Sequence, residues 1–459
     1  MKRILLLGLA AAVVAAAAER GALRVGAARV EVTPAPHPDY PPSGKYDHER
    51  LYIRAIVLDN GVTRGALIGA DLSGLGEEVY VTASKQIAEW LKCPVENVIM
   101  SATHTHSGVR SGPPASGPAR PPQQPTGPTV AAIMDAIGQA SARLQPAQVG
   151  FGTGLTYLNV ARDSISEETH LWTQAANLDG PSDKTVAVVK FATLTGEPIA
   201  AYVNYAMHPV NGYLVGITSA DFAGAACRWA EQAFDDKMVM IFSQGASGDQ
   251  NPLLMRPSTN ALASKSGVKI TGYELVRESV EGPLRDGQVP HGKIDPKVAD
   301  RFERWIDAEG LVLGEEVIRV MTRTRRMSSQ VAIWGAQKPL TCPGRQRTNT
   351  GREGSPGTYQ DGDPVVFRLG VLGIGDIVLT TVNAEVYNLI AQRLKKQSPM
   401  ANTVMVTIAN GRANSGYVPN DAAFGAYSFQ VLGSRLKPGC AEQGIPGTLT
   451  DLVTEYAGR

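Results

Sequence analysis

Apolar segments of strand character alternate along the chain with longer segments whose apolar residues recur at helical spacing. In residues 77–91, for example, Val79, Ala83, Ile87 and Leu91 lie four positions apart, as on one face of a helix. Helices are predicted at residues 77–91, 130–144, 222–234, 296–321 (where Gly310 allows a break) and 384–396. Strands are predicted at residues 23–32, 54–58, 65–71, 97–102, 186–192, 199–206, 238–242, 366–372 and 377–382. This alternation predicts an α/β fold, with a layered sheet core covered by helices in a single large domain.

Long loops rich in glycine and proline are expected between these elements, because the 459 residues include 48 Gly and 30 Pro. The most prominent are a proline-rich loop at residues 111–129 and a Gly/Pro/Arg-rich loop at residues 339–363. Loops of this length in a compact domain usually carry function. A hydrophobic content of 43% argues against disorder. The formal net charge of +1 argues against a nucleic-acid-binding protein, which needs a basic face to meet phosphates.

The N-terminus has the features of a secretory signal peptide. Lys2 and Arg3 precede an apolar run at residues 4–18 that ends in Ala16 to Ala18. The alternative is a membrane anchor, but the run is shorter than the roughly 20 apolar residues that span a bilayer. We therefore expect residues 1–18 to be removed, and residues 19–459 to form one exported domain, secreted or periplasmic. No later segment has so long an apolar run, so no transmembrane segment is expected after cleavage.

The four cysteines are too few for a disulfide framework and have no Cys-x-x-Cys spacing. Cys342 and Cys440 both fall in segments rich in glycine and proline, so an oxidising compartment would allow a bridge between them. Cys227 falls in an alanine-rich helical segment and is expected to be buried and inert.

Three of the seven histidines follow predicted strands directly. His104 and His106 come after the strand at 97–102, and His208 comes after the strand at 199–206. Since ligands gather at the carboxyl ends of strands in open α/β sheets, these residues form a candidate metal site that keeps a position open for water. The alternative is a set of unrelated, hydrogen-bonded histidines, and the short His-x-His spacing does not decide between them.

Carboxylates at other strand ends are candidates to complete such a site. Asp71, Asp249 and Glu385 each follow a predicted strand. For Asp71 and Asp249 we favour a supporting hydrogen bond or a helix cap over direct metal ligation. Glu385 is expected to open the helix at 384–396, where the helix dipole also favours a carboxylate.

Four segments together resemble the neutral/alkaline non-lysosomal ceramidases. In chain order they read VGAARVEVTP (25–34), SATHTHSG (101–108), NYAMHP (204–209) and GDQNP (248–252). The histidine segment is the most specific of them, and the resemblance extends from about residue 22 to Tyr427.

The resemblance implies one catalytic zinc ion (Zn2+) held by two histidines, a glutamate and a tyrosine. The matching positions are His104, His208, Glu385 and Tyr417, with Tyr427 as the less favoured tyrosine. His106 matches a histidine of the site that does not bind the metal, and Arg162 matches an arginine that faces the substrate. Zinc would polarise an amide carbonyl and lower the pKa of a bound water towards about 7. His106 would then stabilise the oxyanion or relay a proton.

The chain departs from this family at two points. Asn251 stands where the family usually has a serine once proposed as a nucleophile, so a serine mechanism at that position is excluded. The longer ceramidases also continue into a C-terminal β-sandwich, for which a chain ending at Arg459 is not expected to have room.

We therefore expect an exported zinc-dependent hydrolase that cleaves an amide bond of a small molecule or lipid, such as a ceramide-like N-acyl lipid. Two alternatives remain from the sequence. One is an esterase that uses the same zinc, and the other is a binding protein that kept the fold without catalysis.

Overall fold

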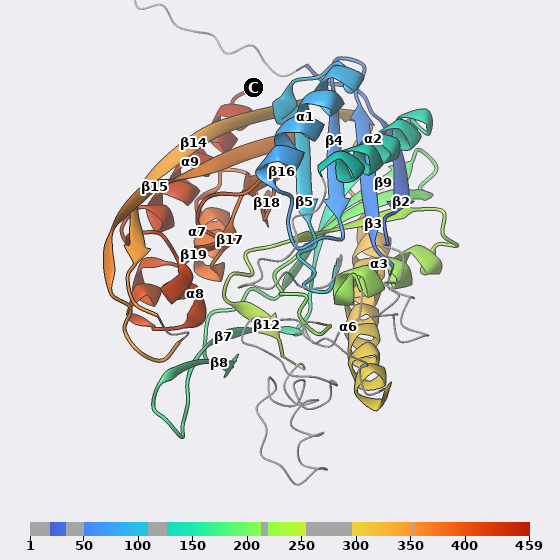
Figure 1. Ribbon diagram of the computed structural model, residues 1–459. Helices are drawn as coiled ribbons and strands as arrows, with labels where there is room; N and C mark the ends of the chain where they lie inside the picture. Colours follow the sequence, from blue (N-terminus) through green and yellow to red (C-terminus); the bar gives the residue numbers. More distant parts are fainter. Residues whose placement is uncertain (1–18, 34–49, 109–125, 213–218, 254–295, 351–352) are drawn as a thin grey trace, which may run out of the picture.

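Two β-sheets form the centre of the protein (Figure 1). The larger, here named the large sheet, has eight strands in the order β11-β10-β9-β6-β2-β3-β4-β5, and the small sheet has four in the order β14-β15-β16-β18. The strands of the large sheet are β2 (Arg24–Glu31), β3 (Tyr52–Asp59), β4 (Arg64–Ala70), β5 (Val98–Ala102), β6 (Gln145–Leu155), β9 (Thr185–Thr193), β10 (Pro198–Tyr205) and β11 (Val239–Gln244). Those of the small sheet are β14 (Ile333–Arg347), β15 (Tyr359–Ile374), β16 (Ile377–Val382) and β18 (Asn402–Thr407). The pairs β4–β5, β10–β11 and β16–β18 are parallel, so each pair ends at a common edge.

The large sheet is curled, so its two edges approach each other. β11 contacts β3, β4 and β5, and the Tyr202 hydroxyl on β10 lies 3.4 Å from Ser101 Oγ on β5. The small sheet packs against the same core, because Leu372 and Val404 belong to one apolar cluster with Tyr202 and Ile56. The curl therefore brings together strand ends that are far apart in the strand order.

Helices cover the outer faces of both sheets (Figure 1). Alternation along each strand sends every second side chain outward, so Val203 faces the helices while Tyr202 faces the core. The helices over the large sheet are α1 (Glu77–Leu91), α2 (Thr126–Ala142), α3 (Asp221–Ala233) and α6 (Pro296–Arg323). Those over the small sheet are α7 (Asn388–Gln397) and α9 (Ala441–Ala457).

Short elements complete the fold. They are β1 (Gly21–Ala22), η2 (Val95–Asn97), β7 (Asn159–Ile165), β8 (Trp172–Asn177), β12 (Gln250–Pro252), β13 (Gln330–Val331), β17 (Glu385–Val386), β19 (Tyr417–Val418), η3 (Asp421–Gly425) and α8 (Phe429–Gly433). The short strands form three further sheets, the pair β1-β13, the three-stranded β12-β7-β8 and the parallel pair β17-β19. The last two carry residues of the candidate site.

The computed structural model describes residues 19–33, 50–108, 126–212, 219–253, 296–350 and 353–459. The predicted signal peptide at 1–18 and most of the proline-rich loop, at 111–125, lie outside these ranges. Within them, no helix combines the length and apolar character needed to cross a membrane.

The backbone that begins at Ile408 joins the two sheets at the edge where β5 and β18 end. The carbonyl of Ile408 accepts a backbone hydrogen bond from Ala102, the last residue of β5. The amide of Ile408 donates one to the carbonyl of Ala384. The nitrogen–oxygen separations are 3.3 and 3.2 Å. Ile408 adopts a left-handed backbone with φ of 52°, which is costly for a β-branched residue. The segment after β18 is thus fastened to both sheets.

The predicted α/β fold is confirmed, but several element boundaries were wrong. Residues 339–347 and 359–363 lie in the paired strands of a long β14–β15 hairpin rather than in a loop. The helix predicted at 384–396 begins only at Asn388, so Glu385 lies in the short strand β17 and not at a helix N-terminus. Helix α9 was not predicted, because its sequence carries four residues of Gly, Pro or Thr between 444 and 448, all poor helix formers.

Gly310 does not break α6. The helix continues without interruption from Pro296 to Arg323. A Cβ at Gly310 would lie 2.2 Å from the Cβ of Ala225 on α3, so the missing side chain lets the two helices pack closely.

The predicted pairing of Cys342 with Cys440 is confirmed, but these cysteines lie on a strand and beside a helix rather than in loops. Cys342 and Cys440 form a disulfide across 98 residues of sequence. Cys342 lies on β14 and Cys440 directly precedes α9, so the bridge ties a strand of the small sheet to the helix that covers it. Cys227 is a free thiol buried in α3, as expected.

Candidate metal centre

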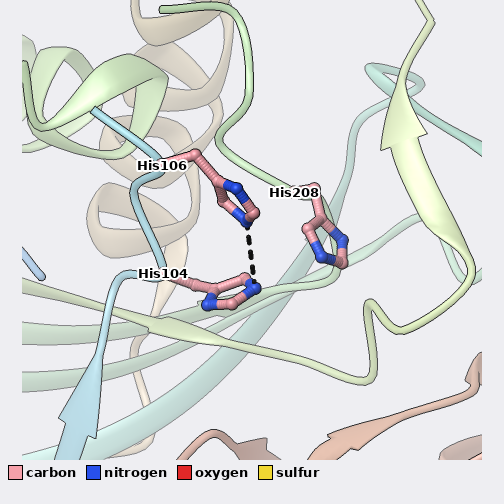
Figure 2. A group of neighbouring side chains, drawn as sticks. All are labelled: His104, His106 and His208. Carbon is pink, nitrogen blue, oxygen red and sulfur yellow. Dashed lines mark hydrogen bonds between the residues drawn. The ribbon is translucent and has the colours of Figure 1, made fainter. Parts of the chain in front are cut away.

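Three histidines gather where β5 and β10 end (Figure 2). His104 and His106 lie on the turn after β5, and His208 lies just after β10. The ring centroids of His104 and His208 are 4.9 Å apart, and those of His104 and His106 are 4.8 Å apart. The curl of the large sheet produces this meeting, because β5 and β10 are not neighbours in the strand order.

Backbone carbonyls fix the ring orientation of His104 and His208. His104 Nδ1 lies 2.5 Å from the carbonyl oxygen of Ser73, and His208 Nδ1 lies 3.1 Å from that of Gln250. Each Nδ1 must therefore carry the proton that it donates, which leaves a lone pair on each Nε2. His104 also has a left-handed backbone, with φ of 67°, and its amide donates to Leu72. This uncommon conformation aims the imidazole back into the site.

Glu385 comes from the small-sheet side and faces both imidazoles. Its Oε2 lies 3.3 Å from His104 Nε2 and 3.2 Å from His208 Nε2. The Ile408 connection brings it there, since Ile408 bonds to the residue directly before Glu385 and to the strand that carries His104.

Three acceptor atoms thus converge without a donor between them. Two Nε2 lone pairs and one carboxylate oxygen repel one another unless a cation lies among them. Tetrahedral zinc with ligands at about 2.0–2.2 Å places its ligand atoms roughly 3.3 Å apart, close to the two distances from Glu385. The donor set therefore fits a zinc ion.

His106 offers a second possible nitrogen ligand. The ligand atoms of His104, His106 and His208 all lie within 4.8 Å of one another, so the three histidines alone could hold a metal. His106 Nε2 is 3.3 Å from His104 Nε2, but its ring centroid is 5.7 Å from that of His208. His106 therefore lies nearer to His104 than to His208 and is not placed between these two rings.

Tyr417 and Arg162 border the same centre. Tyr417 is the register partner of Glu385 in the parallel pair β17–β19, so the two side chains leave neighbouring strands at the same level. Arg162 on β7 is buried, and its Cζ lies 5.5 Å from the centre of the Tyr417 ring. Burial and the charge of Glu385 raise the pKa of the Tyr417 phenol, and the nearby Arg162 opposes this shift. Tyr427, in contrast, meets Gly354 through its backbone carbonyl.

Burial and close charges shift the pKa values of these groups. Burial, reinforced by the charge of Arg162, lowers the pKa of His208 to about 4, and burial with the neighbouring His104 holds that of His106 well below its usual range. Burial raises the pKa of Glu385, but the contacts with the histidines outweigh it and the net shift is downward. His208 and His106 are therefore neutral and Glu385 is ionised at neutral pH, and metal binding requires these states of His208 and Glu385.

The other two carboxylates have supporting roles. Asp71 is fully buried, pairs with Arg54 at 2.5 Å and accepts a hydrogen bond from the amide of Tyr52. Asp249 accepts a hydrogen bond of 2.8 Å from the amide of Asn388, the first residue of α7. Both contacts match the supporting or capping roles that the sequence favoured.

Ser73 and Gln250 are parts of the site that sequence reasoning missed. They act through backbone carbonyls, so no side-chain pattern marks them. Ile408 was missed for the same reason, because its two bonds are made by backbone atoms.

Comparison with known proteins identifies the family. The model of the N-terminal region of neutral/alkaline non-lysosomal ceramidases matches residues 43–345, which is more than half of the chain. The chain belongs to this family. The matched region holds the three histidines and Arg162, whereas Glu385 and Tyr417 lie beyond it.

Two solved structures share the fold of this ceramidase-family protein. Neutral ceramidase from Pseudomonas aeruginosa is 16% identical, with a TM-score of 0.64 over 95% of this chain and 74% of that one. A structure described as ceramidase complexed with C2 is also 16% identical, with a TM-score of 0.65 over 95% and 75% of the two chains. At this identity the likeness establishes the fold, and the chemistry has to be argued from the residues.

Proposed function

We propose that this chain is an exported zinc-dependent hydrolase that cleaves the amide bond of an N-acyl lipid of the ceramide type, or of a related linear amide. The observation that carries the proposal is the approach of Glu385 Oε2 to the Nε2 atoms of both His104 and His208, at 3.3 and 3.2 Å. Membership of the ceramidase family supports the reaction class and the lipid amide. Export rests on the sequence of residues 1–18, which leaves residues 19–459 as the catalytic domain.

We assign the zinc ligands to His104, His208, Glu385 and Tyr417. The contacts of Glu385 Oε2 with both Nε2 atoms favour it over His106 as the third ligand, because the His106 ring lies nearer to His104 than to His208. Tyr417 is assigned from its place beside Glu385 in β19 and from its match to the family's tyrosine ligand.

Bound zinc supplies Lewis acidity towards the amide carbonyl and lowers the pKa of a coordinated water towards about 7. His106 lies within reach of the same space and is neutral, so it accepts a proton from the attacking water. It then passes this proton to the leaving nitrogen as the carbon–nitrogen bond breaks and a carbon–oxygen bond forms. The products are a carboxylic acid and an amine.

Arg162 holds a positive charge at the edge of the site. Burial lowers its pKa, but Tyr417 and Glu385 more than offset this and raise it, so the guanidinium stays charged. A fixed cation of this kind stabilises the negative charge that develops on the carbonyl oxygen. It also lies over the ring of Tyr417, with its Cζ 5.5 Å from the ring centre.

The test combines metal analysis with a substrate screen. Purified protein should contain close to one zinc per chain, and chelation should abolish hydrolysis that added zinc restores. The substrates are N-acyl sphingoid bases and N-acyl amino acids, and mass spectrometry detects the released fatty acid and amine. Full turnover by metal-free protein would refute the proposal.

Ligand variants complete this test. His104→Ala and His208→Ala should each lose zinc and turnover together, by about 1,000-fold or ~4 kcal/mol of transition-state stabilisation. His170→Asn is the matched control, since His170 is exposed in a turn, and asparagine tolerates its left-handed φ of 56°. Zinc retained without hydrolysis of any amide would instead favour a binding protein.

A further inference from the structure

The two terminal nitrogens of the Arg162 guanidinium have fixed partners. Its Nη1 donates to Asn251 Oδ1 at 3.1 Å, and its Nη2 donates to the backbone carbonyl of Gly248 at 2.7 Å. Its Nε is buried and has no hydrogen-bond partner among the described residues. Asn251 therefore supplies a side-chain oxygen to the guanidinium, in addition to the contact that Arg162 makes with Tyr417.

The register of two strands explains this contact. β12 pairs antiparallel with β7, so that Asn251 lies opposite Val160 and Arg162 is two residues further along β7. Diagonal neighbours of this kind share a face, and a long side chain such as arginine spans the distance between them. A guanidinium can only donate, so the amide of Asn251 must present its oxygen.

We propose that Asn251 is a positioning residue, which sets the orientation of the Arg162 guanidinium beside Tyr417 and Glu385. This inference rests on the proposed function and explains the departure from the family's serine. A serine hydroxyl is shorter and can rotate to donate or accept, whereas the amide oxygen of Asn251 is a longer, fixed acceptor. The residue at this position then acts on the reaction through Arg162 and not as a nucleophile.

The surrounding segment shows why accurate placement matters here. The carbonyl of Gln250 holds His208, and the Gly248 amide donates to Val386 at 2.9 Å, directly after Glu385. A Cβ at Gly248 would lie 2.7 Å from the Glu385 carbonyl oxygen, so the two backbones are in close contact. Because one short segment supports several site residues, a test must separate an effect through Arg162 from a general loosening of the segment.

A double-mutant cycle makes this separation. Asn251→Ala should lower kcat about tenfold, with zinc content and melting temperature close to native, because Arg162 loses one charge-assisted hydrogen bond. In an Arg162→Ala background the same substitution should change kcat less than about twofold, since nothing remains to be oriented. A further tenfold loss in that background, or unchanged kcat in Asn251→Ala alone, would overturn the proposal.

A conservative variant tests the role of the oxygen. Asn251→Asp keeps an acceptor at the same reach but offsets part of the Arg162 charge, so kcat should fall less than in Asn251→Ala and Arg162 should keep its place over the Tyr417 ring. Displacement of Arg162 in this variant would show that an acceptor at this position does not orient the guanidinium, against the proposal. Asn402→Ala is the matched control, because Asn402 begins β18 at the end of the strand remote from Ile408 and contacts Asp376.

A crystal structure of Asn251→Ala gives a readout that does not need activity. The guanidinium of Arg162 should leave its place over the Tyr417 ring or lose defined density. An unmoved guanidinium would contradict the positioning role. If native protein hydrolyses no amide, the proposed function fails, and this structure still decides whether Asn251 orients Arg162.

Discussion

The two sheets contribute to the candidate site in different ways. The large sheet supplies His104 and His208 from the turns that follow five- and eight-residue buried strands. The region of the small sheet supplies Glu385 and Tyr417 from β17 and β19, which have only two residues each. The histidines are therefore held by an extensive hydrogen-bonded framework, whereas the other two groups depend on a few local bonds. We therefore expect the positions of the two histidines to resist substitution of nearby residues, and those of Glu385 and Tyr417 to be more sensitive to it.

Glu385→Gln is the sharpest way to break this junction. The substitution preserves shape but removes the charge that faces both imidazoles, so zinc should bind more weakly and turnover should fall about 1,000-fold. Metal content by mass spectrometry and kcat measure the two effects. Glu197→Gln, at an exposed turn, is the control and should be silent. Native turnover in Glu385→Gln would show that the reaction does not need the Glu385 carboxylate.

Removal of the disulfide tests the small sheet by itself. Cys342→Ser combined with Cys440→Ser should lower the free energy of unfolding by about 3–4 kcal/mol, because the closed loop is long. Zinc content should stay native, since the bridge lies within the small sheet and its helix. Denaturant unfolding measures the loss, and Cys93→Ser is the control. Loss of zinc would show that the bridge also shapes the site.

Asp249 links the two regions and gives a pH-dependent prediction. Burial raises its pKa to about 7, so the folded state binds a proton that the unfolded state releases above about pH 4. Stability should therefore fall as pH rises from about 4 to 7 and then level off. Between about pH 5 and 7 this amounts to about 2 kcal/mol, which Asp249→Asn should abolish in urea unfolding. An unchanged slope in the variant would show that another group titrates; Asp179→Asn, on the surface, is the control.

Tyr417→Phe should have the smallest effect of the four. Three ligands remain for the metal, so zinc should be retained while kcat falls about tenfold, or ~1.4 kcal/mol. Tyr157→Phe, whose ring is 66% exposed, is the matched control. A loss as large as that of Glu385→Gln would make Tyr417 an essential ligand.

Sequence patterns predicted many of the elements and site residues of the large sheet, but few of those in the region of the small sheet. Helix α1 was predicted with its observed ends, because its apolar residues repeat regularly and face a buried sheet. His104 and His208 could be found because each directly follows an apolar strand. Their meeting could not be derived from the pattern, since it depends on the curl of the sheet.

Glu385 and Tyr417 show the limit of sequence patterns. A two-residue strand has no periodicity, so Glu385 was placed at a helix start and β19 was not predicted. The strand-end pattern had placed Glu385 among three candidate carboxylates, but only the family resemblance singled out Tyr417. The β14–β15 hairpin was misread as a loop because its glycines and prolines are common in loops, although strand pairing accommodates them here.

The bonds of Ile408 have a mechanical consequence. Ile408 and the two residues after it bond both to the strand before His104 and to the strand before Glu385, so this backbone segment limits the separation of the two groups. Opening of the centre then requires several backbone hydrogen bonds of this segment to break together, and the left-handed φ of Ile408 adds strain that opposes their re-formation. Slow hydrogen exchange at the Ile408 amide would report how often the protein takes that step.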